Sequence, residues 1–222
     1  MHDWIANLFK HPGLLRMGHA QRADDMNLGL GWLYYALGRI VRPQRAVVIG
    51  SFRGFVPLVL GKALHDNLEP GEVIFIDPSR VDNFWKDAER VRGYFGSFGL
   101  DNVRHFCATT QEFVKTQAYR ELGEIGLAFI DGYHSEEQAR FDYEAFEALL
   151  ASRAIVLFHD SMVVREDKIR GPMKVRFFID ELKGNPNLQC LDLPFGVAGL
   201  TLVRKHCQES REPLHEWIDG RP

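Results

Sequence analysis

Short apolar runs recur at regular intervals through the central part of the chain. β-branched and aromatic residues are frequent in these runs, which favours strands, and the segments between them are long enough for one helix each. The run at 155–158 is apolar at every position, as in a strand covered on both faces. The five runs lie at 46–49, 73–76, 103–107, 127–130 and 155–158. Their alternation with helices predicts an α/β fold with a doubly wound, mostly parallel sheet.

The two ends of the chain depart from this alternation. Apolar residues at 4–41 recur every three or four positions, which predicts an N-terminal helical cap that ends before Pro43. Further expected elements are a helix at 135–150 with Ser135 as its N-cap, a helix at 172–182, and an antiparallel hairpin of strands at 189–193 and 197–203. We expect a single domain over 1–222, with the cap at 1–42, the core at 45–205 and a tail at 206–222.

Composition and charge narrow the classes of partner. The 27 basic and 30 acidic side chains give a net charge of -3 and are mixed along the chain, so we expect no nucleic-acid partner. The longest uncharged run, at 26–38, is shorter than the roughly 20 residues of a membrane-spanning helix, and we expect no membrane association. The cysteines form no CxxC pair and the chain starts without a secretory pattern, so a cytoplasmic location is expected.

Two features at predicted strand ends indicate a nucleotide-containing ligand. The turn from Gly50 to Gly54 follows the first strand, where glycines let backbone N–H groups approach a ligand and a helix N-terminus favours negative charge. Asp77 follows the second strand, where a carboxylate can accept hydrogen bonds from both ribose hydroxyls. Each has a simpler interpretation, strand-to-helix packing for the turn and a turn cap for Asp77. Together they predict a dinucleotide or an adenosyl cofactor, and they do not distinguish the two.

Four polar residues follow the fourth and fifth strands. Asp131 and His134 come after the fourth strand, and His159 and Asp160 end the fifth. Unpaired charges are costly to bury, so such a cluster indicates function. Carboxylates with an imidazole suit a divalent ion such as Mg²⁺, Mn²⁺ or Fe²⁺, which would lower the pKa of a substrate hydroxyl. The alternative is structural, with His134 as a helix cap and His159 as a buried core imidazole.

These segments resemble a known family. The sequences VVIGSFRG at 47–54, ID at 76–77, FIDGYHS at 129–135 and IVLFHD at 155–160 are similar to class I S-adenosylmethionine-dependent methyltransferases. The nearest branch is that of the small, often metal-assisted O-methyltransferases related to enzymes that modify antibiotic sugars. The resemblance covers about 45–205, includes a segment at 191–200 that looks like the family's final hairpin, and implies a Rossmann-like core.

The resemblance also implies roles for individual residues. The methionine part of S-adenosylmethionine would contact Gly50, Ser51, Phe52 and Gly54; Asp77 would hold the ribose; Ala108 and Thr109 would flank the adenine; and Asp131 would lie at the methionine and metal side. In the metal-assisted branch the ion would be held by Asp131, His159 and Asp160. His134, or His159 if no metal binds, is then the candidate general base, with Asp160 completing the catalytic set.

Departures from the family pattern leave other functions open. Val48 and Phe52 stand where many members have an acid and a glycine. His159 replaces one of two acids, which would weaken the binding of a hard cation. A nicotinamide-dependent oxidoreductase would also use Asp77, but the turn lacks GxGxxG. A third class is a binding module without catalysis. The expected partner is a small molecule. The aromatic residues Trp4, Phe9, Trp32, Tyr34 and Tyr35 are expected to pack in the core, the alternative being a homo-oligomer contact of the N-terminal helices.

Overall fold

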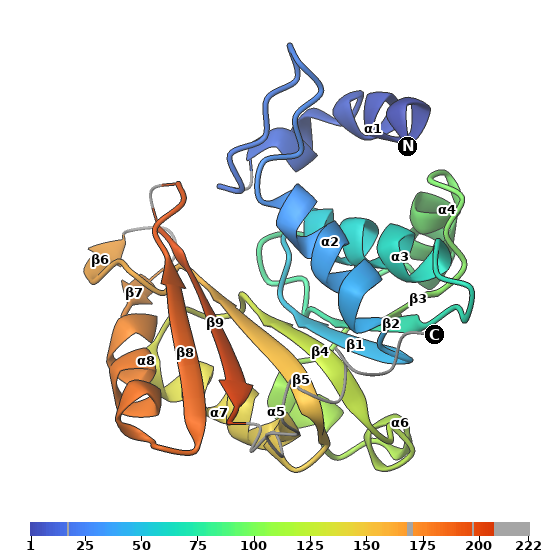
Figure 1. Cartoon of the computed structure of the whole chain (residues 1–222). Coiled ribbons are helices and arrows are strands. Elements are labelled where there is room, and N and C mark those ends of the chain that lie inside the picture. The colour runs from blue at the N-terminus through green and yellow to red at the C-terminus, as the bar shows by residue number, and fades with distance from the viewer. Residues whose placement is uncertain (17, 168–170, 197, 207–222) are drawn as a thin grey trace, which may run out of the picture.

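A seven-stranded sheet of order β3-β2-β1-β4-β5-β9-β8 forms the centre of this computed structural model (Figure 1). The structure describes residues 1–16, 18–167, 171–196 and 198–206. Strands β1 to β5 are parallel, whereas β9 runs antiparallel to β5 and to β8. The strands are β1 Arg45–Ile49, β2 Glu72–Ile76, β3 Val103–Phe106, β4 Ile125–Ile130, β5 Leu150–His159, β8 Leu188–Leu193 and β9 Leu200–Lys205. The predicted doubly wound sheet and its C-terminal hairpin are confirmed.

Helices cover both faces of the sheet and divide the core in two. Neighbouring strand residues point to opposite faces, so Val48 joins the core under α2, α3 and α4, and Val47 joins the core under α5, α7 and α8 (Figure 1). The helices are α1 His2–Phe9, α2 Gly31–Val41, α3 Phe55–His65, α4 Ala88–Gly96, α5 Thr110–Phe113, α6 Gln117–Arg120, α7 Glu136–Glu147 and α8 Val175–Gly184. None of them in the described part of the chain has the length and apolar character needed to span a bilayer.

The N-terminal cap is less helical than the apolar spacing predicts. Between a 3-10 helix at Pro12–Arg16 and α2, the described chain is irregular, with left-handed backbone at Gly18, Ala20, Met26 and Gly29. Of the five aromatic residues of this region, Trp32 is exposed, Tyr34 is fully buried, and the other three are partly buried and pack on the core. The packing interpretation therefore holds for four of the five.

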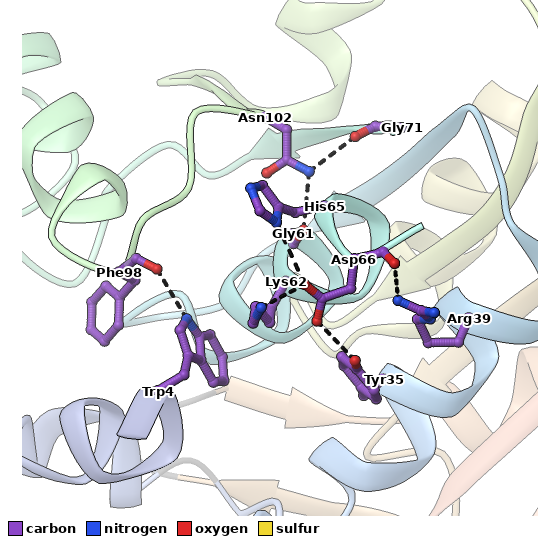
Figure 2. Close-up of polar contacts among 10 residues, drawn as sticks. All are labelled: Trp4, Tyr35, Arg39, Gly61, Lys62, His65, Asp66, Gly71, Phe98 and Asn102. Carbon is purple, nitrogen blue, oxygen red and sulfur yellow. Dashed lines mark hydrogen bonds and ion pairs between the residues drawn. The ribbon is translucent and has the colours of Figure 1, made fainter. Parts of the chain in front are cut away.

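Polar contacts fix the cap and the helical layer at the edge where strands β2 and β3 begin (Figure 2). Trp4 Nε1 donates to the carbonyl oxygen of Phe98 at 3.0 Å. Asp66, just after α3, accepts from Tyr35 Oη at 2.8 Å and from Lys62 Nζ at 2.5 Å. Asn102 Nδ2 donates to the carbonyl oxygens of Gly61 and Gly71. These bonds join α2, α3 and the residue before β3 at the end of the sheet where the strands begin, opposite the strand ends that carry the predicted site.

Several predicted boundaries need correction. The helix predicted at 135–150 ends at Glu147, because β5 begins at Leu150, which pairs with Ile125 of β4. The helix predicted from 172 begins at Val175, and the strand predicted from 197 is described from Leu200. The connection after β5 contains a small hairpin, β6 Arg165–Asp167 with β7 Gly171–Met173, that the sequence pattern does not indicate. Most of the predicted tail, 207–222, lies outside the described residues.

Candidate active site

The glycine turn after β1 lies directly against the end of β4. Gly50 has a left-handed backbone with φ of 69°, and a Cβ atom there would lie 2.3 Å from the carbonyl oxygen of Asp131. Asp131 N donates to the carbonyl oxygen of Ile49 at 2.8 Å, which holds the two segments together. Only glycine fits this close approach. The first turn and the end of the fourth strand, which the sequence places at one edge, are therefore in contact.

Hydrogen bonds and a cation–π contact hold the rest of the turn. Ser51 is buried, and its Oγ accepts from Val56 N at 3.3 Å. Phe52 has φ of 38° and a partly exposed ring, over which the Arg53 guanidinium lies at 4.2 Å from the centroid. Trp85 Nε1 donates to the Phe52 carbonyl oxygen at 2.8 Å. These contacts hold the Ser51 side chain inside the turn and leave the Phe52 ring at its surface.

Asp77 joins the glycine turn to the neighbouring strands. Its Oδ2 accepts from Ser51 N at 3.3 Å and its Oδ1 from Ser79 N at 2.7 Å. Burial raises the pKa of Asp77, and these two backbone hydrogen bonds oppose the shift. Each carboxylate oxygen can accept two hydrogen bonds, so each retains one acceptor position. The turn-cap interpretation accounts for the bond from Ser79, and the second bond ties Asp77 to the glycine turn.

The loop after β3 lies beside Asp77. Asp77 N donates to the Phe106 carbonyl oxygen at 3.1 Å, and Ala108 and Thr109 follow within three residues. Thr109 is the N-cap of α5, where its Oγ1 accepts from Glu112 N at 3.2 Å and its own N–H donates to the Glu112 carboxylate. The Thr109 hydroxyl is therefore engaged in a capping box. Its neighbour Ala108 is partly exposed.

Asp131, His134, His159 and Asp160 form one compact cluster at the ends of β4 and β5. His134 Nε2 lies 3.2 Å from Asp131 Oδ1 and 3.1 Å from Asp160 Oδ2. His159 Nδ1 lies 3.3 Å from Asp131 Oδ1 and 3.4 Å from Asp160 Oδ1. His159 and Asp160 are buried, whereas Asp131 and His134 are partly exposed. The sequence prediction that these four residues meet is confirmed.

The charges of the cluster are balanced within it. Burial lowers the pKa of His134 and of His159, but hydrogen bonds and attraction from the two carboxylates outweigh burial and raise these values to about 9 and about 10. Burial likewise raises the pKa of the carboxyl groups, and the two imidazoles outweigh it, so the pKa of Asp131 and of Asp160 lies below the usual range. Without a bound ion, the two carboxylates thus favour the protonated form of both imidazoles, and the imidazoles favour the ionised form of both carboxyl groups.

His19 joins this cluster from the N-terminal cap, and sequence reasoning missed it. Its ring is fully buried, with its centroid 4.5 Å from that of His159, and its Nδ1 lies 3.1 Å from the Tyr34 hydroxyl. Burial lowers the pKa of His19 to about 3. The residue lies outside every strand end and apolar period, so no local pattern marks it. The sequence does contain Gly18 and Gly29 nearby, and both have left-handed backbone in the structure, but glycines alone do not mark a site.

A buried polar network supports the turn that carries Asp131 and His134. Asp142 of α7 is almost fully buried, and its Oδ1 accepts from Gln138 Nε2 at 2.8 Å. Its Oδ2 lies 3.1 Å from the position that a Cβ atom on Gly132 would take. Burial raises the pKa of Asp142 to about 6, against hydrogen bonds from Thr110 and Gln138. The carboxyl group of Asp142 therefore approaches the turn at Gly132 from the side of α7.

The shifted pKa of Asp142 predicts a pH-dependent stability. A carboxyl group with a raised pKa in the folded state binds more protons there, so stability falls as pH rises from about 4 to about 6 and stays low above that range. We expect Asp142→Asn to remove this loss, so that its effect on the free energy of unfolding is more favourable at pH 7.5 than at pH 4.5 by roughly 1–3 kcal/mol. Urea unfolding at both pH values measures it. Glu144→Gln, an exposed carboxylate of α7, is the control, and an equal shift in both variants would contradict the expectation.

Comparison with known proteins identifies the fold and the family. A family model described as a methyltransferase domain matches residues 47–161. A putative O-methyltransferase from Klebsiella pneumoniae has 16% identity and a TM-score of 0.67, with 90% of this chain and 89% of that chain covered. The O-methyltransferase TomG from Streptomyces achromogenes, solved in complex with SAM, has 19% identity and a TM-score of 0.62, with 88% and 90% covered.

Two further relatives extend the comparison. An O-methyltransferase from Bacillus cereus, solved in complex with SAH, has 16% identity and a TM-score of 0.66, with 91% of this chain and 90% of that chain covered. An uncharacterized protein from Sinorhizobium fredii is 26% identical over 143 residues, which is 60% of this chain but 14% of that protein. The chain therefore spans a small part of that curated relative. The family match covers the glycine turn, Asp77 and the whole His/Asp cluster, and the chain belongs to the methyltransferase domain family, which confirms the class I resemblance found in its sequence.

Proposed function

We propose that this chain transfers a methyl group from S-adenosylmethionine to a hydroxyl group of a small molecule. The observation that carries the proposal is that one rigid turn contacts both halves of the site. Ser51 N donates to Asp77, and Gly50 lies against the backbone of Asp131. A ligand bound along the turn would thus have its ribose near Asp77 and its reactive end near the His/Asp cluster. The similar folds solved in complex with SAM or SAH support this choice of cofactor.

The residues around the turn fit an adenosyl cofactor. We assign the methionine part to the turn formed by Gly50, Ser51, Phe52 and Gly54, because close backbone and a helix N-terminus suit a carboxylate there. Asp77 keeps two acceptor positions for the ribose hydroxyls. The loop at Ala108 and Thr109, next to Asp77 across β3, is assigned to the adenine. Val48, where many members of the family have an acid, is fully buried in the core.

The cluster also fits a divalent cation. Asp131, His134 and Asp160 each offer a ligand atom, and these atoms lie within 4.8 Å of one another. Adjacent ligands of an octahedral ion with bonds of about 2.1 Å lie about 3 Å apart, close to the 3.2 and 3.1 Å that separate His134 Nε2 from the carboxylate oxygens. The family resemblance implies His159, in place of His134, as the imidazole ligand of the ion. We propose Asp131 and Asp160 as ligands in both cases, with one of the two imidazoles, which favours Mn²⁺ or Fe²⁺ over Mg²⁺.

With His159 as the imidazole ligand of the ion, proton removal from the acceptor hydroxyl falls to His134. It lies between the two carboxylates and is more exposed than His159, with 13% against 5% of the side chain accessible. With both carboxylates free it holds its own proton at neutral pH, since its pKa is raised to about 9. A divalent cation on those carboxylates would supply the balancing positive charge and lower the pKa of a bound hydroxyl. The methyl transfer itself requires alignment more than covalent participation, and the rigid turn supplies that alignment.

An assay with methyl-labelled S-adenosylmethionine tests this function. We expect label to enter a hydroxyl of a phenol, sugar or polyketide in a mixed acceptor panel containing Mn²⁺, and Asp131→Asn to reduce the incorporation roughly 100-fold or more. Asp24→Asn, an exposed carboxylate of the N-terminal segment, serves as the control. Equal incorporation by the wild type and Asp131→Asn would contradict the assigned site. A chain that binds S-adenosylmethionine without transferring label to any acceptor would favour the binding-module alternative.

A further inference from the structure

His19 comes from an irregular segment but has one of the most confined side chains near the site. Its ring stacks on Phe55 of α3, with centroids 5.0 Å apart and planes inclined by 21°. On another side it meets the His159 ring at 4.5 Å and 51°. No part of the side chain is exposed to solvent. His19 therefore fills the space between the helical layer and the buried side of the His/Asp cluster.

The main chain and one ring nitrogen fix the orientation of His19. Its carbonyl oxygen accepts from Leu30 N at 2.8 Å, and a Cβ atom on Gly29 would lie 2.1 Å from that oxygen. Its Nδ1 is bonded to the hydroxyl of Tyr34, which is itself fully buried. Its Nε2 has no hydrogen-bond partner among the described residues. The ring is thus held by packing and by Nδ1, and its contribution to the cluster is the surface it presents to His159.

His159 needs such a surface, because its own bonds do not determine how its ring lies. Its Nδ1 faces Asp131 Oδ1 and Asp160 Oδ1 at 3.3 and 3.4 Å, distances at which a small ring rotation removes both contacts. Gly18 also lies near the ring, since a Cβ atom there would be 3.7 Å from His159 Cε1. Without the His19 ring, the His159 imidazole would have an empty space to turn into.

We propose that His19 is a positioning residue that keeps the His159 imidazole turned toward Asp131 and Asp160. The inference rests on the proposed function of the His/Asp cluster, and it adds a residue of the N-terminal cap to that site. The ring contact of His19 with the cluster is made with His159, so we expect its effect on the site to pass through that imidazole. Residues that orient the groups around a metal site commonly change metal affinity 10- to 100-fold when they are replaced.

Two variants separate packing from the loss of a histidine. His19→Ala removes the ring, and His19→Phe keeps a flat ring of similar shape against His159. We expect His19→Ala to weaken Mn²⁺ binding 10- to 100-fold in calorimetry and to shift the side-chain NMR signals of His159, measured without metal and assigned with His159→Gln. His19→Phe should restore both, and S-adenosylmethionine binding should be unchanged in each. His65→Ala, an exposed histidine at the opposite edge of the sheet, is the matched control (Figure 2).

Unchanged His159 signals and Mn²⁺ affinity in His19→Ala would overturn the proposal, and so would a His19→Phe variant as impaired as His19→Ala. A purely structural role would lower thermal stability and leave the Mn²⁺ affinity of the folded protein in place. If the wild type binds no Mn²⁺, the metal assignment of the proposed function fails, while the NMR comparison still decides the role of His19. If His19→Ala does not fold, His19→Val is used in its place, because valine keeps part of the side-chain volume, and the same two measurements are made.

Discussion

Asp77→Ala is expected to weaken S-adenosylmethionine binding roughly 100-fold or more. In the proposed binding mode, the substitution removes the charged acceptor of two ribose hydrogen bonds, each of which would contribute about 1.5–3 kcal/mol. It also leaves the buried N–H groups of Ser51 and Ser79 without their partner, so the glycine turn loses its side-chain bond to Asp77 and keeps only the backbone bond from Gly50 N to the Ile76 carbonyl oxygen of β2. Both effects act first on the cofactor half of the site, where these hydrogen bonds lie. Isothermal titration with S-adenosylmethionine measures the change.

Asp82→Ala is the matched control for this experiment. Asp82 belongs to the same loop after β2, but its carboxylate is partly exposed and pairs with Arg53 at 2.5 Å. Its loss should leave S-adenosylmethionine affinity within a few-fold of the wild type, because an exposed ion pair contributes little. A wild-type affinity in Asp77→Ala would show that the carboxylate after β2 does not hold the ribose.

Asp160→Asn is expected to lower the rate of methyl transfer roughly 100- to 1,000-fold while S-adenosylmethionine affinity stays near the wild-type value. Asp160 has a left-handed backbone with φ of 53°, a conformation that asparagine tolerates, so the variant changes charge more than shape. One of the two carboxylates that face His134 and His159 is thereby neutralised. The loss removes a candidate metal ligand and disturbs the general base together.

Three measurements together test this expectation. Labelled methyl transfer gives the rate, titration with Mn²⁺ gives the metal affinity, and titration with S-adenosylmethionine checks that the cofactor half of the site is intact. Asp180→Asn, an exposed carboxylate of α8 that pairs with Arg176, serves as the control. If Asp160→Asn kept its full rate and Mn²⁺ affinity, the cluster would have no part in the reaction.

Much of the site edge was predictable because parallel strands place their carboxyl ends at one edge of a sheet. Gly50, Asp77, Asp131 and His159 each follow or end a run of apolar residues, so the topology alone brings them together. The pairing of β1 with both β2 and β4 puts the glycine turn between Asp77 and Asp131. These contacts depend on strand order, which the regular alternation of strands and helices restricts to a few arrangements.

The features that the sequence did not predict depend on contacts between distant segments. The exclusion of 148–150 from α7 follows from the pairing of Leu150 with Ile125, which overrides a local apolar pattern typical of a helix. The approach of His134 to Asp160 depends on the shape of one short turn. His19 reaches His159 because left-handed glycines bend the cap onto the sheet edge. Periodicity within a segment carries no information about such contacts.

A crystal structure with S-adenosylhomocysteine tests the central claim most directly. The account predicts that the ribose hydroxyls lie within hydrogen-bonding distance of the Asp77 carboxylate, that the carboxylate of the homocysteine part lies along the turn from Gly50 to Gly54, and that the sulfur faces Asp131. The account would be contradicted if S-adenosylhomocysteine bound elsewhere. It would also be contradicted if, at a saturating ligand concentration, side chains filled the space beside Asp77.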